Sequence, residues 1–227
     1  MSTGTAARKL PRIARFARPR PATLCMSASP AVPATVDARR AHLADLLAAR
    51  SARRGSFTLA SGRTSDLYID ARLTTMSPDG LALIGPLALD LLAETGWHVD
   101  AAGGLTLGAD PIAYAIAYAS TAGRTPDAWV RAFTVRKQPK AHGTGQRIEG
   151  PFRAGDRVAV VEDVITTGGS ALQAVEAVRA AGGTVVGVLA VVDREEGGRE
   201  AIEQAAGVPV LSLVGARDVI GRLDAGG

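Results

Sequence analysis

The amino-acid sequence predicts an α/β fold, in which a central, mainly parallel sheet is flanked by helices. Two observations support this class. Short runs of apolar, often β-branched residues alternate along the chain with longer segments of helical periodicity. A length of 227 residues, 47% of them hydrophobic and 21% charged, is typical of one globular domain with a full core.

The first expected elements precede the alternating part of the chain. Asp37–Arg50 has the leucine spacing of an amphipathic helix, and Gly55–Ala60 and Asp66–Ala71 have the composition of two short strands around a turn. A second helix is expected to start at Ser77, whose side chain suits an N-cap before a proline, and to end near Glu94.

Strands and helices then alternate, which predicts parallel neighbours joined by helices. The expected strands are Val99–Gly103, Trp129–Val135, Val158–Val161, Val185–Val192 and Pro209–Val214. The expected helices are Ala109–Ser120, Ser170–Ala181 and a short one near Arg199–Ala206. Ligands of such sheets bind at the carboxyl ends of the strands, so the segments that follow the strands are the candidates for a site.

Residues 1–36 differ in composition from the rest of the chain. They hold six basic residues and no acidic residue, which leaves 20 basic and 22 acidic residues, a net charge of −2, for residues 37–227. The segment is rich in Ala, Pro, Ser and Arg without apolar periodicity, so we expect a disordered basic extension. Two explanations of the extension stay open. It is a transit peptide, or it results from a start site assigned too far upstream, with Met26 near the true N-terminus.

The charge distribution and the cysteine usage narrow the class of protein. Because the overall charge of +4 comes from the extension, no nucleic-acid partner is expected, and no apolar stretch is long enough to predict a membrane span. The single cysteine, Cys25, lies in the extension, so residues 37–227 cannot form disulfides. A cytoplasmic location is expected from this composition.

The most informative segment reads RVAVVEDVITTGGSALQAVEAVRAAGG, from Arg157 to Gly183. A buried strand is expected to end at two acids, Glu162 and Asp163, and a loop of hydroxyl and small residues then leads into a helix. Unpaired N–H groups and the helix dipole make such a turn an anion site. The acids can face the hydroxyls of a ribose or the water shell of Mg²⁺. The expected ligand is therefore a sugar phosphate.

Two common nucleotide motifs do not fit this segment. A P-loop would need a lysine directly before Ser170, where the chain has Gly169. A dinucleotide fingerprint would place its glycines directly after the strand, where the chain has Glu162 and Asp163.

A second polar segment, RKQPKAHGTG, follows the strand that ends at Val135. It is too polar for a core and too rich in glycine for a helix, which is typical of a mobile loop that covers a site. By itself, a run of charges is more often a solvated surface.

These motifs together resemble a known family. The run VVEDVITTGGS resembles the phosphoribosyl-pyrophosphate (PRPP) motif of type I phosphoribosyltransferases, and the remaining motifs resemble those of the orotate phosphoribosyltransferase family. RKxxKxHG resembles its catalytic loop, FTLxSGRxS its hood over the base, and DRxEGG its base-binding segment. The resemblance implies a type I phosphoribosyltransferase domain over residues 37–227, with the hood at about 51–75 and a flexible catalytic loop at about 136–150.

The resemblance also implies the role of each site residue. The implied catalytic residues are Lys140, His142 and Asp163. The implied PRPP-binding residues are Arg136, Lys137, Lys140, His142, Glu162, Asp163, Val164, Ile165, Thr166, Thr167, Gly168, Gly169 and Ser170. The implied orotate-binding residues are Thr166, Arg194 and Tyr68. An arginine suits a carboxylated base, because its planar fork pairs with a carboxylate through two hydrogen bonds.

The glycine-rich turn GGLTLGADP, from Gly103, would bind the diphosphate of PRPP through its backbone. The chain departs from the family at two positions where many members carry a lysine, because it has Ala60 in the hood and Gly108 in this turn.

The implied reaction joins orotate to C1 of PRPP and releases diphosphate, which gives orotidine 5′-monophosphate in the biosynthesis of UMP. Mg²⁺ would be carried by PRPP rather than by dedicated protein ligands. In the family the catalytic loop reaches into the neighbouring subunit, which implies a homodimer with shared active sites. Two alternatives stay open: a phosphoribosyltransferase for another base, against which Arg194 argues, and a non-catalytic PRPP-sensing regulator, against which the cationic loop argues.

Overall fold

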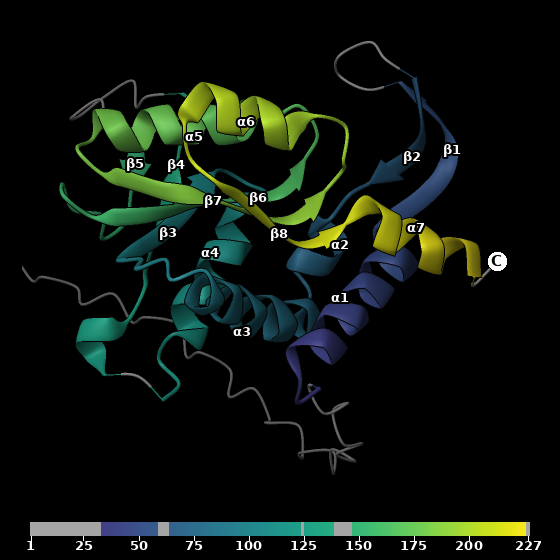
Figure 1. Ribbon diagram of the computed structural model, residues 1–227, viewed down its shortest axis with the longest axis horizontal. Coiled ribbons are helices and arrows are strands. Elements are labelled where there is room, and N and C mark those ends of the chain that lie inside the picture. The colour runs from purple at the N-terminus through teal and green to yellow at the C-terminus, as the bar shows by residue number, and fades with distance from the viewer. Residues whose placement is uncertain (1–32, 59–63, 124, 139–146, 226–227) are drawn as a thin grey trace, which may run out of the picture. The chain divides into compact units, whose positions relative to one another are not determined.

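The computed structural model describes residues 33–58, 64–123, 125–138 and 147–225 (Figure 1). The expected basic extension therefore lies almost entirely outside the described residues, as do Ala60, Lys140 and His142. The chain from residue 32 onward forms one compact unit. Among the described residues, no helix combines the length and the apolar character that a membrane span requires.

Six strands of the described chain form one twisted sheet in the order β5-β4-β3-β6-β7-β8. Their bounds are β3 Ala101–Leu105, β4 Arg131–Val135, β5 Ile148–Glu149, β6 Arg157–Ile165, β7 Thr184–Asp193 and β8 Val210–Gly215. Neighbouring strands are parallel except for the edge strand β5, which runs antiparallel to β4. The predicted α/β class with a mainly parallel central sheet is confirmed.

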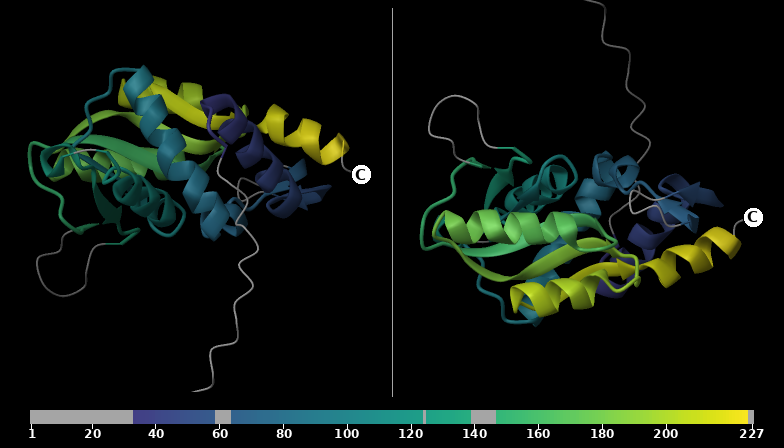
Figure 2. Two further views of the ribbon diagram at one scale, coloured as in Figure 1. Left: turned by 90° about the horizontal axis from the view of Figure 1, so that it is seen from below. Right: turned by 90° about the horizontal axis from the view of Figure 1, so that it is seen from above.

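Helices cover both faces of this sheet (Figures 1 and 2). One face packs against α1 (Val36–Arg50), α3 (Pro78–Glu94) and α4 (Ala109–Ala119), and the other packs against α5 (Gly169–Ala180) and α6 (Gly198–Ala206). On β6, Val161 contributes to the first core, whereas Val158 and Val160 contribute to the second. Side chains that alternate between two buried faces explain why the strands read as continuous apolar runs.

A small antiparallel pair of strands lies beside the main sheet, within residues 51–75, where the resemblance implies a hood (Figure 1). β1 (Ala52–Thr58) pairs with β2 (Thr64–Ile69), so both strands lie two or three residues nearer the N-terminus than expected. The short helix α2 (Arg72–Thr75) follows. Ser77 caps α3 as expected, because its Oγ accepts a hydrogen bond from the amide of Gly80 at 3.2 Å.

Four elements of the structure were missing from the sequence-based expectations. The helices α2 and α7 (Ala216–Ala225), the short strand β5 and a 3₁₀ turn over Pro126–Ala128 were not predicted. The helix α7 follows β8 directly, without a turn signal, and contains Gly221, which lowers helix propensity.

The expected end of β6 at Val161 was wrong. The strand continues through the two acids, because Val164 pairs with Val192 and Ile165 pairs with Asp193 in the parallel ladder. Ile165 is buried in the core beside α5 and α6. Charged residues are rare in a central strand, and for this reason the acids were interpreted as the strand's end. The correction moves the start of the loop to Thr166.

Candidate active site

A cavity of about 300 Å³ lies where the carboxyl ends of β3 and β6 meet the hood strand β2 and the helix α2. The residues that line it are Tyr68, Ile69, Asp70, Arg72, Leu105, Thr106, Leu107, Gly108, Lys137, Glu162, Asp163, Val164 and Ser170. Six of these are predicted site residues, namely Tyr68, Lys137, Glu162, Asp163, Val164 and Ser170. Segments far apart in the sequence thus meet at the edge of the sheet where ligands of α/β proteins bind.

The turn from β6 into α5 forms one side of this cavity. Thr167, Gly169 and Ser170 are exposed, and no side chain of the described residues caps the first amides of α5. Amides without intrahelical partners and the positive end of the helix dipole favour an anion at this position. The turn therefore has the chemistry of a phosphate site, as its sequence predicts.

The two acids of β6 have different environments. Glu162 is 7% exposed, and its Oε2 is buried without a hydrogen-bond partner among the described residues. Burial, and next to it the charge of Asp163, raises the pKa of Glu162 well above its usual range. Asp163 is half-buried, and its Oδ1 accepts a hydrogen bond from the amide of Val164 at 2.9 Å. The pair therefore presents one carboxyl that favours the neutral form beside one more accessible carboxylate.

This asymmetry predicts a pH dependence of stability. The pKa of Glu162 is raised in the folded protein, so its contribution to stability is complete below its pKa in the unfolded chain and is lost as pH rises through its folded pKa. Glu162→Gln removes this titration. As pH rises above the usual pKa of a glutamate, about 4.3, the free energy of unfolding of the unsubstituted protein should fall relative to that of the variant, by at most about 1.4 kcal/mol per pH unit for one proton.

Urea unfolding of both proteins at several pH values measures this difference. A difference in unfolding free energy that stays constant over the whole pH range would contradict the raised pKa.

The glycine-rich turn between β3 and α4 forms the opposite side of the cavity. Asp110 holds it in place, because Asp110 accepts hydrogen bonds from the hydroxyls of Thr106 at 2.7 Å and Thr134 at 2.9 Å. A Cβ atom on Gly108 would lie 2.6 Å from Oδ1 of Asp163, so a side chain at this position would displace that carboxylate. The sequence did not single out the role of Asp110, although a threonine four residues before an aspartate on a helix start was a visible signal.

The stem of the expected catalytic loop is described, whereas its centre is not. Arg136 pairs with Glu149 at 3.0 Å, and its amide donates to the carbonyl of Arg147 at 2.8 Å. Lys137 lines the cavity. Lys140 and His142, two of the predicted catalytic residues, lie outside the described residues.

The predicted base-binding residues are only partly brought to the cavity. Tyr68 lines it, with its ring centroid 5.3 Å from that of Phe57. Thr166 and Arg194 do not line the cavity as the described residues form it. They are adjacent to each other, because the amide of Arg194 donates to the carbonyl of Ile165 at 2.9 Å. A Cβ atom on Gly198 would lie 2.3 Å from the carbonyl oxygen of Thr166, so only glycine permits this approach.

The side chain of Arg194 is 5% exposed and is held by two partners. Its Nη2 donates to Oε1 of Glu196 at 2.6 Å and to Oγ of Ser65, on β2, at 3.1 Å. These contacts join the hood to the segment that follows β7.

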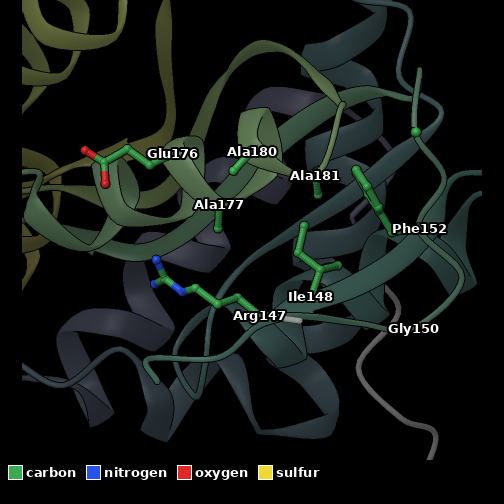
Figure 3. A pocket seen from close by; sticks show the side chains of 9 residues that line it. Arg147, Ile148, Gly150, Phe152, Glu176, Ala177, Ala180 and Ala181 are labelled. Atoms are coloured by element: carbon green, nitrogen blue, oxygen red, sulfur yellow. The ribbon is translucent and has the colours of Figure 1, made fainter. Parts of the chain in front are cut away.

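A second cavity, of about 760 Å³, lies between β5 and α5 (Figure 3). Its lining is Arg147, Ile148, Gly150, Phe152, Ala154, Glu176, Ala177, Ala180 and Ala181. Figure 3 shows Ile148 and Phe152 facing the alanines of α5 across it. The lining contains none of the predicted site residues and no helix N-terminus, so the smaller cavity is the candidate active site.

The mainly parallel sheet, the uncapped β6–α5 turn and the two acids near the carboxyl end of β6 match the type I phosphoribosyltransferase fold, which solved structures similar to this chain share. No family model matches the chain. It is 51% identical over 177 residues to the orotate phosphoribosyltransferase of Aquifex aeolicus, covering 77% of this chain and 93% of that protein. It is 49% identical over 187 residues to that of Rhodopseudomonas palustris strain BisB18, covering 81% and 97%. The chain belongs to the orotate phosphoribosyltransferase family.

Solved structures lead to the same family. The crystal structure of Mycobacterium tuberculosis orotate phosphoribosyltransferase in complex with Fe(III) dicitrate has a TM-score of 0.69 and 49% identity, covering 80% of this chain and 98% of that chain. The complex of the M. tuberculosis enzyme with PRPP has a TM-score of 0.64 and 42% identity, covering 80% and 91%. The predicted enzyme class, a pentosyltransferase of this family, is confirmed.

Proposed function

We propose that the enzyme transfers the 5-phosphoribosyl group of PRPP to orotate at the cavity between β3, β6 and β2, which gives orotidine 5′-monophosphate and diphosphate. One observation carries this placement: an uncapped helix N-terminus, a strand-end acid pair and Lys137 lie around one cavity. The helix N-terminus and the acids belong to the segment that resembles the PRPP motif, and Lys137 belongs to the segment that resembles the catalytic loop.

In this proposal the groups of PRPP are distributed over the three sides of the cavity. The 5-phosphate binds to the amides of the turn 166–170, and the ribose hydroxyls face Glu162 and Asp163. The diphosphate lies between the backbone of the turn 105–108 and the cations Arg136 and Lys137, with Lys140 and His142 arriving from the loop. Positive charge there stabilises the leaving group as C1 acquires oxocarbenium character.

We propose that Mg²⁺ accompanies PRPP. The half-buried carboxylate of Asp163 lines the cavity and can hydrogen-bond to the waters of a hydrated cation. Among the described residues, no group of three or more His, Cys, Asp or Glu side chains could hold a metal ion by itself.

Orotate is proposed to bind beside Tyr68, Thr166 and Arg194. The adjacency of Thr166 and Arg194 supports this assignment, as does the link from Arg194 to the hood strand that carries Tyr68. The guanidinium of Arg194 would pair with the carboxylate that distinguishes orotate from other bases.

Arg194→Ala is expected to raise the KM for orotate by about tenfold or more, because loss of a charge-assisted hydrogen bond costs about 1.5–3 kcal/mol. The KM for PRPP should change much less. Steady-state kinetics with each substrate varied in turn measures both constants. Arg217→Ala is the matched control, since the side chain of Arg217 is exposed and the ion pair that it forms among the described residues is with Glu195. A shift in PRPP saturation with unchanged orotate saturation would place the base elsewhere.

A homodimer with shared active sites is also proposed. Large apolar side chains are exposed on α2 and directly after it, on the turn after β3 and on α4, and these residues are Leu73, Met76, Leu107, Tyr114 and Tyr118. Exposed apolar surface of this kind marks protein interfaces. Arg72 and Leu107 also line the cavity, so a partner bound at these elements would lie close to the site.

We further propose a cytoplasmic location. Its support is the absence of cysteine from residues 37–227, which suits a compartment where proteins do not rely on disulfides.

A further inference from the structure

The guanidinium of Arg194 already has partners within the protein. Its side chain is 5% exposed, and Nη2 donates to the carboxylate of Glu196 at 2.6 Å and to the hydroxyl of Ser65 at 3.1 Å. Its Nε is buried and has no hydrogen-bond partner among the described residues. An arginine that is to bind a ligand carboxylate is therefore engaged by a carboxylate of its own chain.

The geometry of a guanidinium makes these contacts competitive with a ligand. A carboxylate that binds an arginine through two hydrogen bonds uses Nη2 together with either Nη1 or Nε. Both arrangements require a hydrogen of Nη2, which carries two hydrogens and here has two acceptors. A ligand carboxylate can bind through two hydrogen bonds only after one of the present acceptors has left.

The exchange is chemically favourable for a carboxylated base. Glu196 contacts Nη2 through one oxygen, whereas a ligand carboxylate at the Nε–Nη2 edge would form two charge-assisted bonds and would satisfy the unpaired Nε. The side chain of Glu196 is 23% exposed, so it can turn to water when it is released. A neutral base offers no such exchange, because it has no anionic group to replace Glu196.

We propose that Glu196 is an internal competitor for the base carboxylate: it holds Arg194 in the ligand-free enzyme and leaves Nη2 when the carboxylate of the base binds. This inference rests on the proposed role of Arg194 in binding orotate. It makes Glu196 a determinant of specificity, because only a base with its own carboxylate restores a charged partner to the buried guanidinium.

The neighbouring acid of the same segment does not share this role. Glu195 accepts a hydrogen bond from the amide of Arg217 at 3.1 Å, at the start of α7, and its carboxylate lies 3.6 Å from the guanidinium of Arg217. Glu195→Gln therefore makes the same change of charge one residue away without touching Arg194, and it is the matched control.

The test is the kinetics of Glu196→Gln. A neutral amide holds the guanidinium less strongly than a carboxylate, so the KM for orotate should fall about fivefold, with the KM for PRPP unchanged. Glu196→Ala, which removes the acceptor, should lower the KM for orotate as well. Titration calorimetry provides a second measurement, in which Glu196→Gln should bind orotidine 5′-monophosphate more tightly and uridine 5′-monophosphate, which lacks the carboxylate, as before. Thermal unfolding verifies that each variant is folded.

The outcomes separate this inference from the proposed function. A KM for orotate that is unchanged or raised in Glu196→Gln and Glu196→Ala would overturn the competition, because a purely positioning role predicts weaker orotate binding. An equal fall of the KM for orotate in Glu195→Gln would overturn the competition too. The effect would then come from the loss of a negative charge near the site and not from the release of Arg194. If Arg194→Ala raises the KM for orotate while the Glu196 variants do not lower it, only the competition by Glu196 is contradicted and the proposed function stands. If Arg194→Ala leaves the KM for orotate unchanged, both are lost.

Discussion

Replacing Lys140 by alanine is expected to lower kcat by about 100-fold, while the affinity for PRPP changes only a few-fold. The resemblance of RKxxKxHG to the catalytic loop assigns Lys140 to the diphosphate, and the described stem of this loop brings Lys137 to the cavity. Negative charge develops on the leaving diphosphate during the reaction. An interaction that is stronger in the transition state than in the ground state lowers kcat, whereas uniform binding changes only KM.

Single-turnover and steady-state rates together with direct PRPP binding measure both quantities for Lys140→Ala. Arg153→Ala is a suitable control, because Arg153 is an exposed cation on the connection from β5 to β6 and does not line the cavity. A normal kcat in Lys140→Ala would remove the loop from the mechanism.

Asp163→Asn is expected to weaken PRPP binding by about 10- to 100-fold, which corresponds to the roughly 1.5–3 kcal/mol of a hydrogen bond to a charged group. Asp163 is the more accessible acid of the pair and lines the cavity next to the turn before α4. Orotate binding should weaken less, since the base is assigned to Arg194 and Thr166. Equilibrium binding of each substrate to the variant measures the two effects separately.

Asp127→Asn provides the corresponding control, because Asp127 is exposed in the 3₁₀ turn before β4. An unchanged PRPP affinity in Asp163→Asn would place the ribose elsewhere.

The same two variants also test the shared site. If the catalytic loop of one subunit serves the cavity of its partner, a heterodimer of Lys140→Ala and Asp163→Asn subunits contains one site with an intact loop and an intact acid. Mixing the two variants should then restore part of the activity. No recovery after verified subunit exchange would count against a site built from two subunits.

Some parts of the site could be predicted from the sequence, because a short run of residues there is compatible with only one kind of local structure. A buried strand followed by two acids and TTGG predicts an anion turn, and the structure has Glu162, Asp163 and Ser170 around one cavity. The parallel order of the sheet likewise follows from the alternation of strands and helices. These features depend on short segments whose conformation is decided by neighbours in the sequence.

Other parts depend on contacts that no local pattern encodes. Ser65 meets Arg194 although 129 residues separate them, so the arginine's partners could not be predicted from the motif DRxEGG. The burial of Glu162 also depends on packing from several elements, and its raised pKa follows from that burial. The extension of β6 past the acids required the register with β7, which a single strand's sequence does not contain.

The most direct test of the proposed activity follows the absorbance of orotate after PRPP and Mg²⁺ are added to the purified enzyme, with adenine, hypoxanthine and uracil as competing bases. The expected result is a loss of orotate that requires PRPP and that none of the three bases slows at equal concentration, because none carries the carboxylate assigned to Arg194. Orotate that persists, or the preferential consumption of another base, would contradict the assignment.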